Sequence, residues 1–101
     1  MKAYQIFEKP NSWTRGTFAR DKFLDPVATW NPQACQFCIV GALKRVYPDE
    51  SRRVDAISRV REVLLKRCTV EQWGSVGVSY FNDHIAQSQS EIHALLKEAN
   101  V

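Results

Sequence analysis

Residues 49–67 read Asp-Glu-Ser-Arg-Arg-Val-Asp-Ala-Ile-Ser-Arg-Val-Arg-Glu-Val-Leu-Leu-Lys-Arg, and this stretch decides the fold class. Its apolar residues return every three or four positions, which is the period of an α-helix with one buried face. The sequence therefore predicts a helix that begins at about Asp49 or Ser51 and ends at Arg67. Its apolar stripe is expected to be formed by Val54, Ile57, Val60, Leu64 and Cys68.

Helices are also predicted on both sides of this stretch. The last helix should begin at Ser88-Gln89-Ser90-Glu91, a pattern typical of a capping box, in which the serine hydroxyl and the glutamate carboxylate bind unpaired backbone N–H groups. The helix before residues 49–67 should begin at Asn31-Pro32, a favoured N-cap followed by a favoured first residue, and should end before Pro48. The small pair Gly41-Ala42 in its middle predicts a close neighbour at that point.

The rest of the chain predicts shorter elements. Residues 2–9 suit a short amphipathic helix that ends at Pro10, because proline cannot continue it. Residues 13–30 indicate a short hairpin or an irregular aromatic-rich loop, and residues 76–78 a strand that pairs with it. The expected fold is therefore α+β, a single globular domain of residues 1–101 with about four helices packed with a small two- or three-stranded β element. The residues expected in its core are Phe37, Cys38, Ala42, Ile57, Leu64, Ile92, Leu95 and Leu96.

The composition is that of an ordinary soluble domain. The chain has 101 residues, of which 45% are hydrophobic and 25% charged, enough for one core without disulfides or metals. Its formal net charge of +3 favours acidic partners weakly. No apolar run approaches the roughly 20 residues that span a bilayer, and the N-terminus is too polar for a signal peptide. We therefore expect a cytoplasmic protein with no membrane partner, whose three cysteines stay reduced.

The pattern Cys35-Gln36-Phe37-Cys38 has the spacing of zinc sites and of redox disulfides. Zinc would need two more ligands from Cys68, His84 or His93, and these form no second tight pair. A redox pair would need a strand before the helix start, and Trp30-Asn31-Pro32 is not one. We expect the two cysteines mainly to pack as small apolar residues, with no metal and no cofactor bound.

Two further features offer chemistry, each with a plain structural alternative. His84 next to Asp83 suits a general base, but a solvated loop histidine is the preferred interpretation, because sequence neighbours rarely form a catalytic pair. His93 is expected at the surface without a role. The second feature is a basic face of the long helix that would bind phosphates or an acidic partner. Its alternative is a solvated face held by the ion pairs Asp55–Arg59 and Glu62–Lys66. The residues of this face lie seven apart: Arg52, Arg59 and Lys66.

The main candidate site joins two segments about 60 residues apart in the chain. Both are short polar loops that lead into helices, and both mix arginine with its natural acceptors, so we expect them to meet. Asp83 would hold one arginine and leave the other for an anionic ligand or an acidic partner surface. The alternative is an internal strut of ion pairs and hydrogen bonds. The predicted binding residues are Trp13, Arg15, Arg20, Asn82 and Asp83.

The same segments carry a resemblance to a known family. The order Trp13-Thr14-Arg15-Gly16, Cys38-Ile39-Val40-Gly41-Ala42, Asn82-Asp83 and Glu91-Ile92 resembles a family of small uncharacterised proteins from bacteria, notably actinobacteria, and from their phages. The resemblance covers about residues 3–99. The family usually has tryptophan or another aromatic residue before the cysteine that Cys38 matches, and Phe37 fills that place here, whereas Cys35 is an addition. The resemblance implies no known activity, but it suggests a phage or mobile-element origin and hence a small dedicated binder.

Three functions follow from these observations, in order of preference. The first is a small non-enzymatic binding protein, phage-encoded, that binds a host protein and inhibits or modulates it, as a host-defence inhibitor would. The second is a protein that sequesters a small anionic nucleotide-like ligand between arginines and a tryptophan face. The third is an enzyme that uses Cys38, or His84 with Asp83. Nucleic acid is a further, less favoured partner.

Overall fold

The computed structural model describes residues 1–67 and 77–101, and its fold is α+β, as the sequence predicts. The described residues form several helices and one small antiparallel sheet of two strands. None of the helices described combines the length and the apolar character needed to cross a bilayer. In chain order the elements are the 3-10 helix η1 (Ala3–Glu8), β1 (Ala19–Arg20), β2 (Gln36–Phe37), α1 (Ile39–Val46), α2 (Glu50–Arg67), α4 (Val78–Tyr80), the π-helical turn η2 (Phe81–Ile85) and α5 (Gln89–Ala99).

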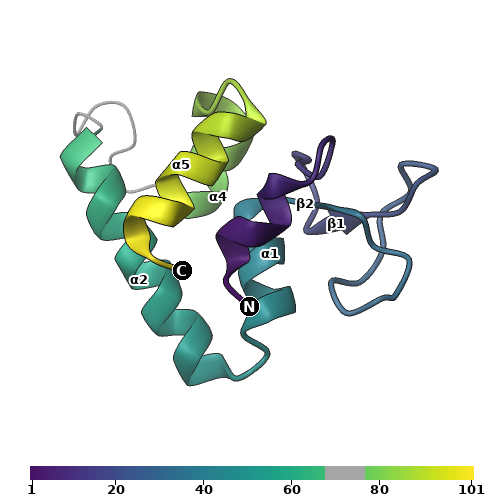
Figure 1. Ribbon diagram of the computed structural model, residues 1–101, viewed down its shortest axis with the longest axis horizontal. Helices are drawn as coiled ribbons and strands as arrows, with labels where there is room; N and C mark the ends of the chain where they lie inside the picture. Colours follow the sequence, from purple (N-terminus) through teal and green to yellow (C-terminus); the bar gives the residue numbers. More distant parts are fainter. Residues whose placement is uncertain (68–76) are drawn as a thin grey trace.

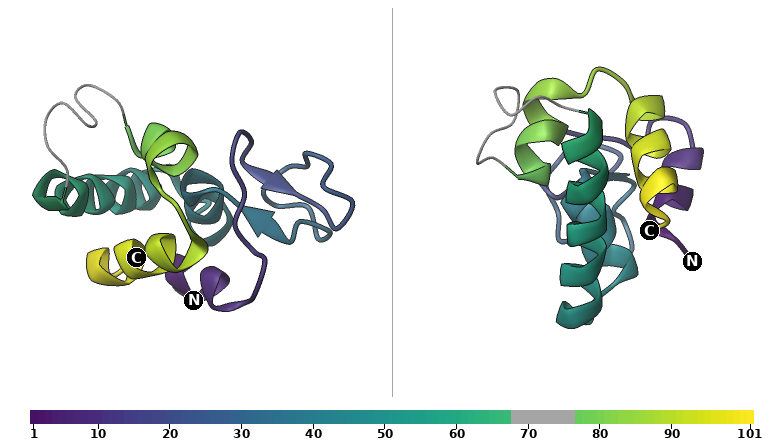
Figure 2. Two further views of the ribbon diagram at one scale, coloured as in Figure 1. Left: turned by 90° about the horizontal axis from the view of Figure 1, so that it is seen from above. Right: turned by 90° about the vertical axis from the view of Figure 1, so that its left-hand side faces the viewer.

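The helices form the body of the molecule and the strands lie at one end of it (Figure 1). Helix α5 packs against both α2 and η1, and α1 packs against α2, α4 and η1. Both termini lie on the helical body, while the segment around β1 and β2 projects from its far end (Figure 2). We call residues 17–31 of this projection the aromatic lobe.

The core lies between the helices. Its largest fully buried apolar side chains are Ile39 and Leu43 from α1, Val60 and Leu64 from α2, and Ile92, Leu95 and Leu96 from α5. Burial of the predicted core residues is confirmed except for Ile57, which is half-buried. The capping box of α5 is also confirmed at its serine, because the Ser88 hydroxyl accepts a hydrogen bond from the Glu91 N–H at 3.3 Å. The Glu91 carboxylate reaches one residue further back, to the N–H of Gln87 at 2.7 Å.

Helix α1 begins later than predicted. It starts at Ile39, not at Asn31, because Gln36 and Phe37 pair with Arg20 and Ala19 as strand β2. The side chain of Asn31 instead closes a local turn by accepting the N–H of Gln33 at 2.8 Å. Pairing with a distant strand therefore outweighs a good local N-cap signal, and the helix ends before Pro48 as expected.

Helix α2 has the predicted bounds but is rotated relative to the predicted stripe. Val54 is 55% exposed, and the buried residues are Ala56, Val60, Val63 and Leu64. Ala56 is buried in place of the larger Val54, and its short side chain allows α2 to approach the neighbouring helices closely. Cys68, the last residue of the predicted stripe, lies outside the described residues.

The β prediction is partly confirmed. Strand β1 pairs with β2, which lies outside residues 13–30, so the expected local hairpin is reduced to a single bridge between Arg20 and Pro26. The predicted strand at residues 76–78 is wrong for Val78, which begins α4. Val76 lies outside the described residues. The sheet therefore has its second strand from the segment before α1.

Gly41 confirms the close approach predicted from the Gly41-Ala42 pair. A Cβ atom built on Gly41 would lie 1.8 Å from the backbone oxygen of Phe18. No side chain fits at that distance, so α1 lies directly against the backbone of the aromatic lobe.

We predict that Gly41→Ala destabilises the protein by about 2 kcal/mol or more, because the backbone of Phe18 would have to move. Gly77→Ala is the matched control, since the described structure has no atom within 4 Å of its Cβ position. Urea unfolding of both variants tests this. Equal midpoints for the two variants would contradict the close contact.

Candidate functional site

The two predicted loops meet at Asn82, which is fully buried in η2. Its Oδ1 accepts hydrogen bonds from the Trp13 indole N–H at 2.8 Å and from the Ile39 backbone N–H at 3.0 Å. Its Nδ2 donates to the Thr14 carbonyl at 3.1 Å and to the Asp83 carboxylate at 2.9 Å. These four bonds use the full capacity of the amide. We call this set of contacts the Asn82 latch.

The other predicted residues lie around the latch but pair differently from the prediction. Asp83 accepts the Gly16 backbone N–H at 3.1 Å. Arg15 lies over the Trp13 ring, with its guanidinium carbon 4.6 Å from the ring centroid, and donates to the Ala86 carbonyl. Within the described residues, neither Arg15 nor Arg20 forms an ion pair with Asp83. The expected Arg–Asp pair is therefore wrong.

Arg20 belongs to the root of the aromatic lobe. Its Nε donates to the Thr14 hydroxyl at 2.8 Å, and its terminal nitrogens donate to the carbonyls of Leu24 and Arg15 at 2.9 and 3.2 Å. The structure thus brings Trp13, Arg15, Asn82 and Asp83 together. Arg20 is linked to this group indirectly, because Thr14 bonds both Arg20 and Asn82. Most of their polar groups are engaged internally, and their role in binding remains a prediction.

The cysteines lie in different environments. Cys35 is exposed, whereas Cys38 is buried and caps α1, its Sγ accepting the Gly41 N–H at 3.2 Å. Burial raises the pKa of the Cys38 thiol, and the nearby Asp83 carboxylate raises it further. The geometry therefore favours a neutral thiol at Cys38 and supplies no activated nucleophile.

Among the described residues, neither histidine forms a hydrogen bond or an ion pair with Cys35 or Cys38. His84 is exposed and its ring lies 4.7 Å from that of Tyr80. His93 is half-buried rather than at the surface, edge-on to Tyr4, with its Nε2 3.5 Å from the Glu8 carboxylate. Over residues 1–67 and 77–101, no three side chains of the metal-binding types gather around one point.

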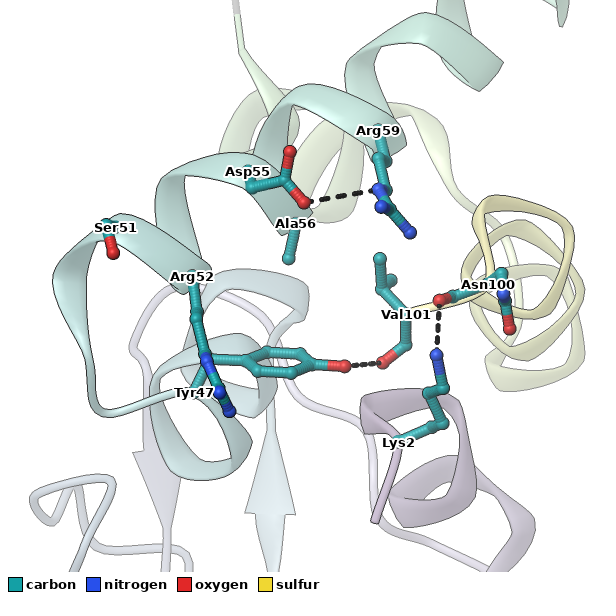
Figure 3. Close-up of a pocket in the computed structure, with 9 residues that line it drawn as sticks. All are labelled: Lys2, Tyr47, Ser51, Arg52, Asp55, Ala56, Arg59, Asn100 and Val101. Atoms are coloured by element: carbon teal, nitrogen blue, oxygen red, sulfur yellow. Dashed lines mark hydrogen bonds and ion pairs between the residues drawn. The ribbon is translucent and has the colours of Figure 1, made fainter.

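The predicted basic face is exposed on α2. Arg59 forms the expected pair with Asp55, with 3.2 Å between Nε and Oδ2. The expected Glu62–Lys66 pair is not formed between the described residues. Arg52 and Arg59 border a groove of about 310 Å³, which Lys2, Tyr47 and Val101 also line (Figure 3). Lys66, at the far end of the helix, does not line it.

A second hollow lies between the aromatic lobe and the helices, and the sequence did not reveal it. We call it the lobe cleft, and its volume is about 650 Å³. Lys44 lies over the Phe18 ring, with its Nζ 3.9 Å from the ring centroid, and Trp30 is 77% exposed. The density of aromatic residues in 13–30 was the one sequence feature that pointed to this cleft. It did not indicate that Lys44 and Arg45 of α1 would lie opposite these residues. The cleft is lined by Phe18, Val27, Ala28, Thr29, Trp30, Lys44, Arg45, Pro48 and Arg53.

We predict that Asn82→Ala destabilises the protein by about 2 kcal/mol or more, because the N–H groups of Trp13 and Ile39 lose a buried acceptor. Asn31→Ala is the control and should cost at most about 1 kcal/mol, since its side chain makes one local turn bond. Thermal unfolding measures both, and an equal loss in the two variants would show that the latch carries little stability.

We also predict that iodoacetamide modifies Cys35 well before Cys38 in the native protein. Burial protects the Cys38 thiol, and its raised pKa leaves little thiolate at pH 8. Peptide mapping by mass spectrometry resolves the two sites. Faster labelling at Cys38 would instead support the catalytic reading of this residue.

Comparison with known proteins gives a family without an assigned activity. One family model, described as a family of unknown function (DUF6197), matches residues 2–100. No curated protein and no solved structure matches the chain.

Proposed function

The chain belongs to the family of unknown function DUF6197, and we propose that it is a small non-enzymatic binding protein that contacts another protein through its aromatic lobe. The observation that carries this proposal is the exposure of large apolar side chains on the lobe, three of which are more than half exposed. Phe23 is 72% exposed, Leu24 59% and Trp30 77%. Aromatic residues of this kind dominate the binding energy of protein interfaces.

The lobe is held in one conformation before any partner binds. Arg45 donates to the carbonyls of Thr29 and Asn31 at 2.8 and 2.9 Å. The Asp21 carboxylate accepts the N–H groups of Phe23 and Asp25 at 2.9 and 3.1 Å. A lobe fixed in this way loses little conformational entropy on binding, which favours affinity.

The charges around the lobe favour an acidic partner surface. Lys44, Arg45 and Arg53 line the lobe cleft, and no acidic residue of the described part of the chain does. On the same lobe, the Lys22 Nζ lies 5.1 Å from the centroid of the Phe23 ring. An acidic surface with an apolar centre would pair with these cations at its rim and cover the exposed aromatic side chains.

The resemblance to phage proteins extends the proposal to the partner's identity. A phage-encoded binder of this size would act in the host cytoplasm, where it would inhibit or modulate a host protein, for example one of host defence. The residues Trp13, Arg15, Arg20, Asn82 and Asp83 would then serve the site mainly as its support. They fix the root of the lobe through the Asn82 latch and the Arg20–Thr14 bond.

We predict that Trp30→Ala weakens capture of the partner at least tenfold, because loss of an interface tryptophan typically costs about 2 kcal/mol or more. Val54→Ala is the matched control, since Val54 is an exposed apolar residue on α2 outside the lobe. The measurement is affinity purification from a lysate of the source organism with quantitative mass spectrometry. Both variants should melt close to the wild type.

Two outcomes would contradict the proposal. If Trp30→Ala retains the same proteins at the same level as Val54→Ala, the lobe is not the contact surface. If the wild-type protein retains no protein above a blank support, a binding function toward another protein is itself wrong.

A further inference from the structure

The groove in Figure 3 gathers positive charge from two separate segments of the chain. Lys2 enters from just before η1, and Arg52 and Arg59 from one face of α2. The two arginines are seven residues apart, so they lie about 10 Å apart along the helix axis. The groove therefore has a cation at each end of its α2 wall and a third on the opposite side.

These cations are incompletely neutralised by the residues around them. Arg59 uses its Nε for Asp55, and Lys2 donates to the Asn100 carbonyl at 2.9 Å. Within the described residues, the Arg52 guanidinium has no hydrogen-bond acceptor and no ion-pair partner. Among the described residues of the lining, Asp55 is the one acidic side chain, against the three cations Lys2, Arg52 and Arg59.

The hydroxyl groups of two other lining residues, Tyr47 and Ser51, are already engaged within the protein. The Tyr47 hydroxyl donates to the Val101 carbonyl at 3.0 Å, so its ring forms an apolar wall (Figure 3). The Ser51 hydroxyl donates to the Asp49 carboxylate at 2.7 Å, outside the groove lining. The same carboxylate accepts the Arg52 backbone N–H at 3.2 Å, which fixes the helical turn that carries this arginine.

We propose that this groove binds a small molecule with phosphate or carboxylate groups, held at one end by Arg52 and at the other by Arg59 and Lys2. Guanidinium groups bind both kinds of oxyanion through paired N–H donors. A volume of about 310 Å³ suits a small metabolite. The site shares no lining residue with the lobe cleft, so it is independent of the proposed protein contact.

The test is an NMR titration of the full chain with three probes: inorganic phosphate, pyrophosphate and succinate. Saturable shifts in the backbone amides of residues 51–59 are expected with at least one probe. The probe that binds most tightly distinguishes a phosphate site from a carboxylate site. Arg52→Gln should weaken this binding at least tenfold, because it removes a charge-assisted pair.

Arg61→Gln is the matched control. It removes the same charge from the same helix, but its position is nine residues from Arg52 and hence on the opposite face of α2. It should leave the affinity within about twofold of the wild type, since general attraction at that distance is screened by salt. Equal weakening in Arg52→Gln and Arg61→Gln would reduce the effect to general charge attraction and overturn the site, as would the absence of saturable shifts with all three probes.

Discussion

The side-chain amide of Asn82 is the contact on which the rest of the arrangement depends. It is fully buried, and its four hydrogen bonds join the segment of Trp13 and Thr14, the first turn of α1 and the turn η2. A buried amide that lost any of these partners would leave a polar group unsatisfied in a medium of low dielectric constant. The position of Asn82 therefore fixes where residues 13–14 lie. The Thr14 hydroxyl in turn accepts a hydrogen bond from Arg20 and so positions the root of the lobe.

The elements that the sequence predicts well are those determined by local chemistry. The bounds of α2 follow from helical periodicity, and the start of α5 follows from Ser88 and Glu91. Each of these signals involves only residues that are close together in the sequence. The predicted start of α1 was wrong because the actual start depends on the pairing of Phe37 with Ala19, which is distant in the sequence and leaves no local pattern. The rotation of α2 escaped prediction for a similar reason, since burial of Ala56 in place of Val54 is decided by neighbouring helices.

The candidate site shows the same division. Complementary polar residues were enough to predict that the loops of Trp13 and Asn82 meet. They were not enough to predict which groups pair, because Arg15 and Arg20 donate to nearby backbone carbonyls and Asp83 accepts the Gly16 N–H. The lobe cleft was missed because Trp30 and Lys44 are brought together by the late start of α1. The sequence predicts Trp30 at the end of an aromatic-rich segment and Lys44 far along a helix that begins at Asn31, which gives no reason to expect a hollow between them.

The aromatic lobe joins a fixed base to a tip that contributes nothing to the core. At the base, the contact between Gly41 and the backbone of Phe18 leaves no room for change, and α1 acts as a rigid mount. At the tip, Phe23 and Leu24 are mostly in solvent, so their replacement would leave folding almost unaffected. A protein built in this way can alter what it recognises by substitutions at the tip alone, and its lineage can follow a changing target without rebuilding the domain.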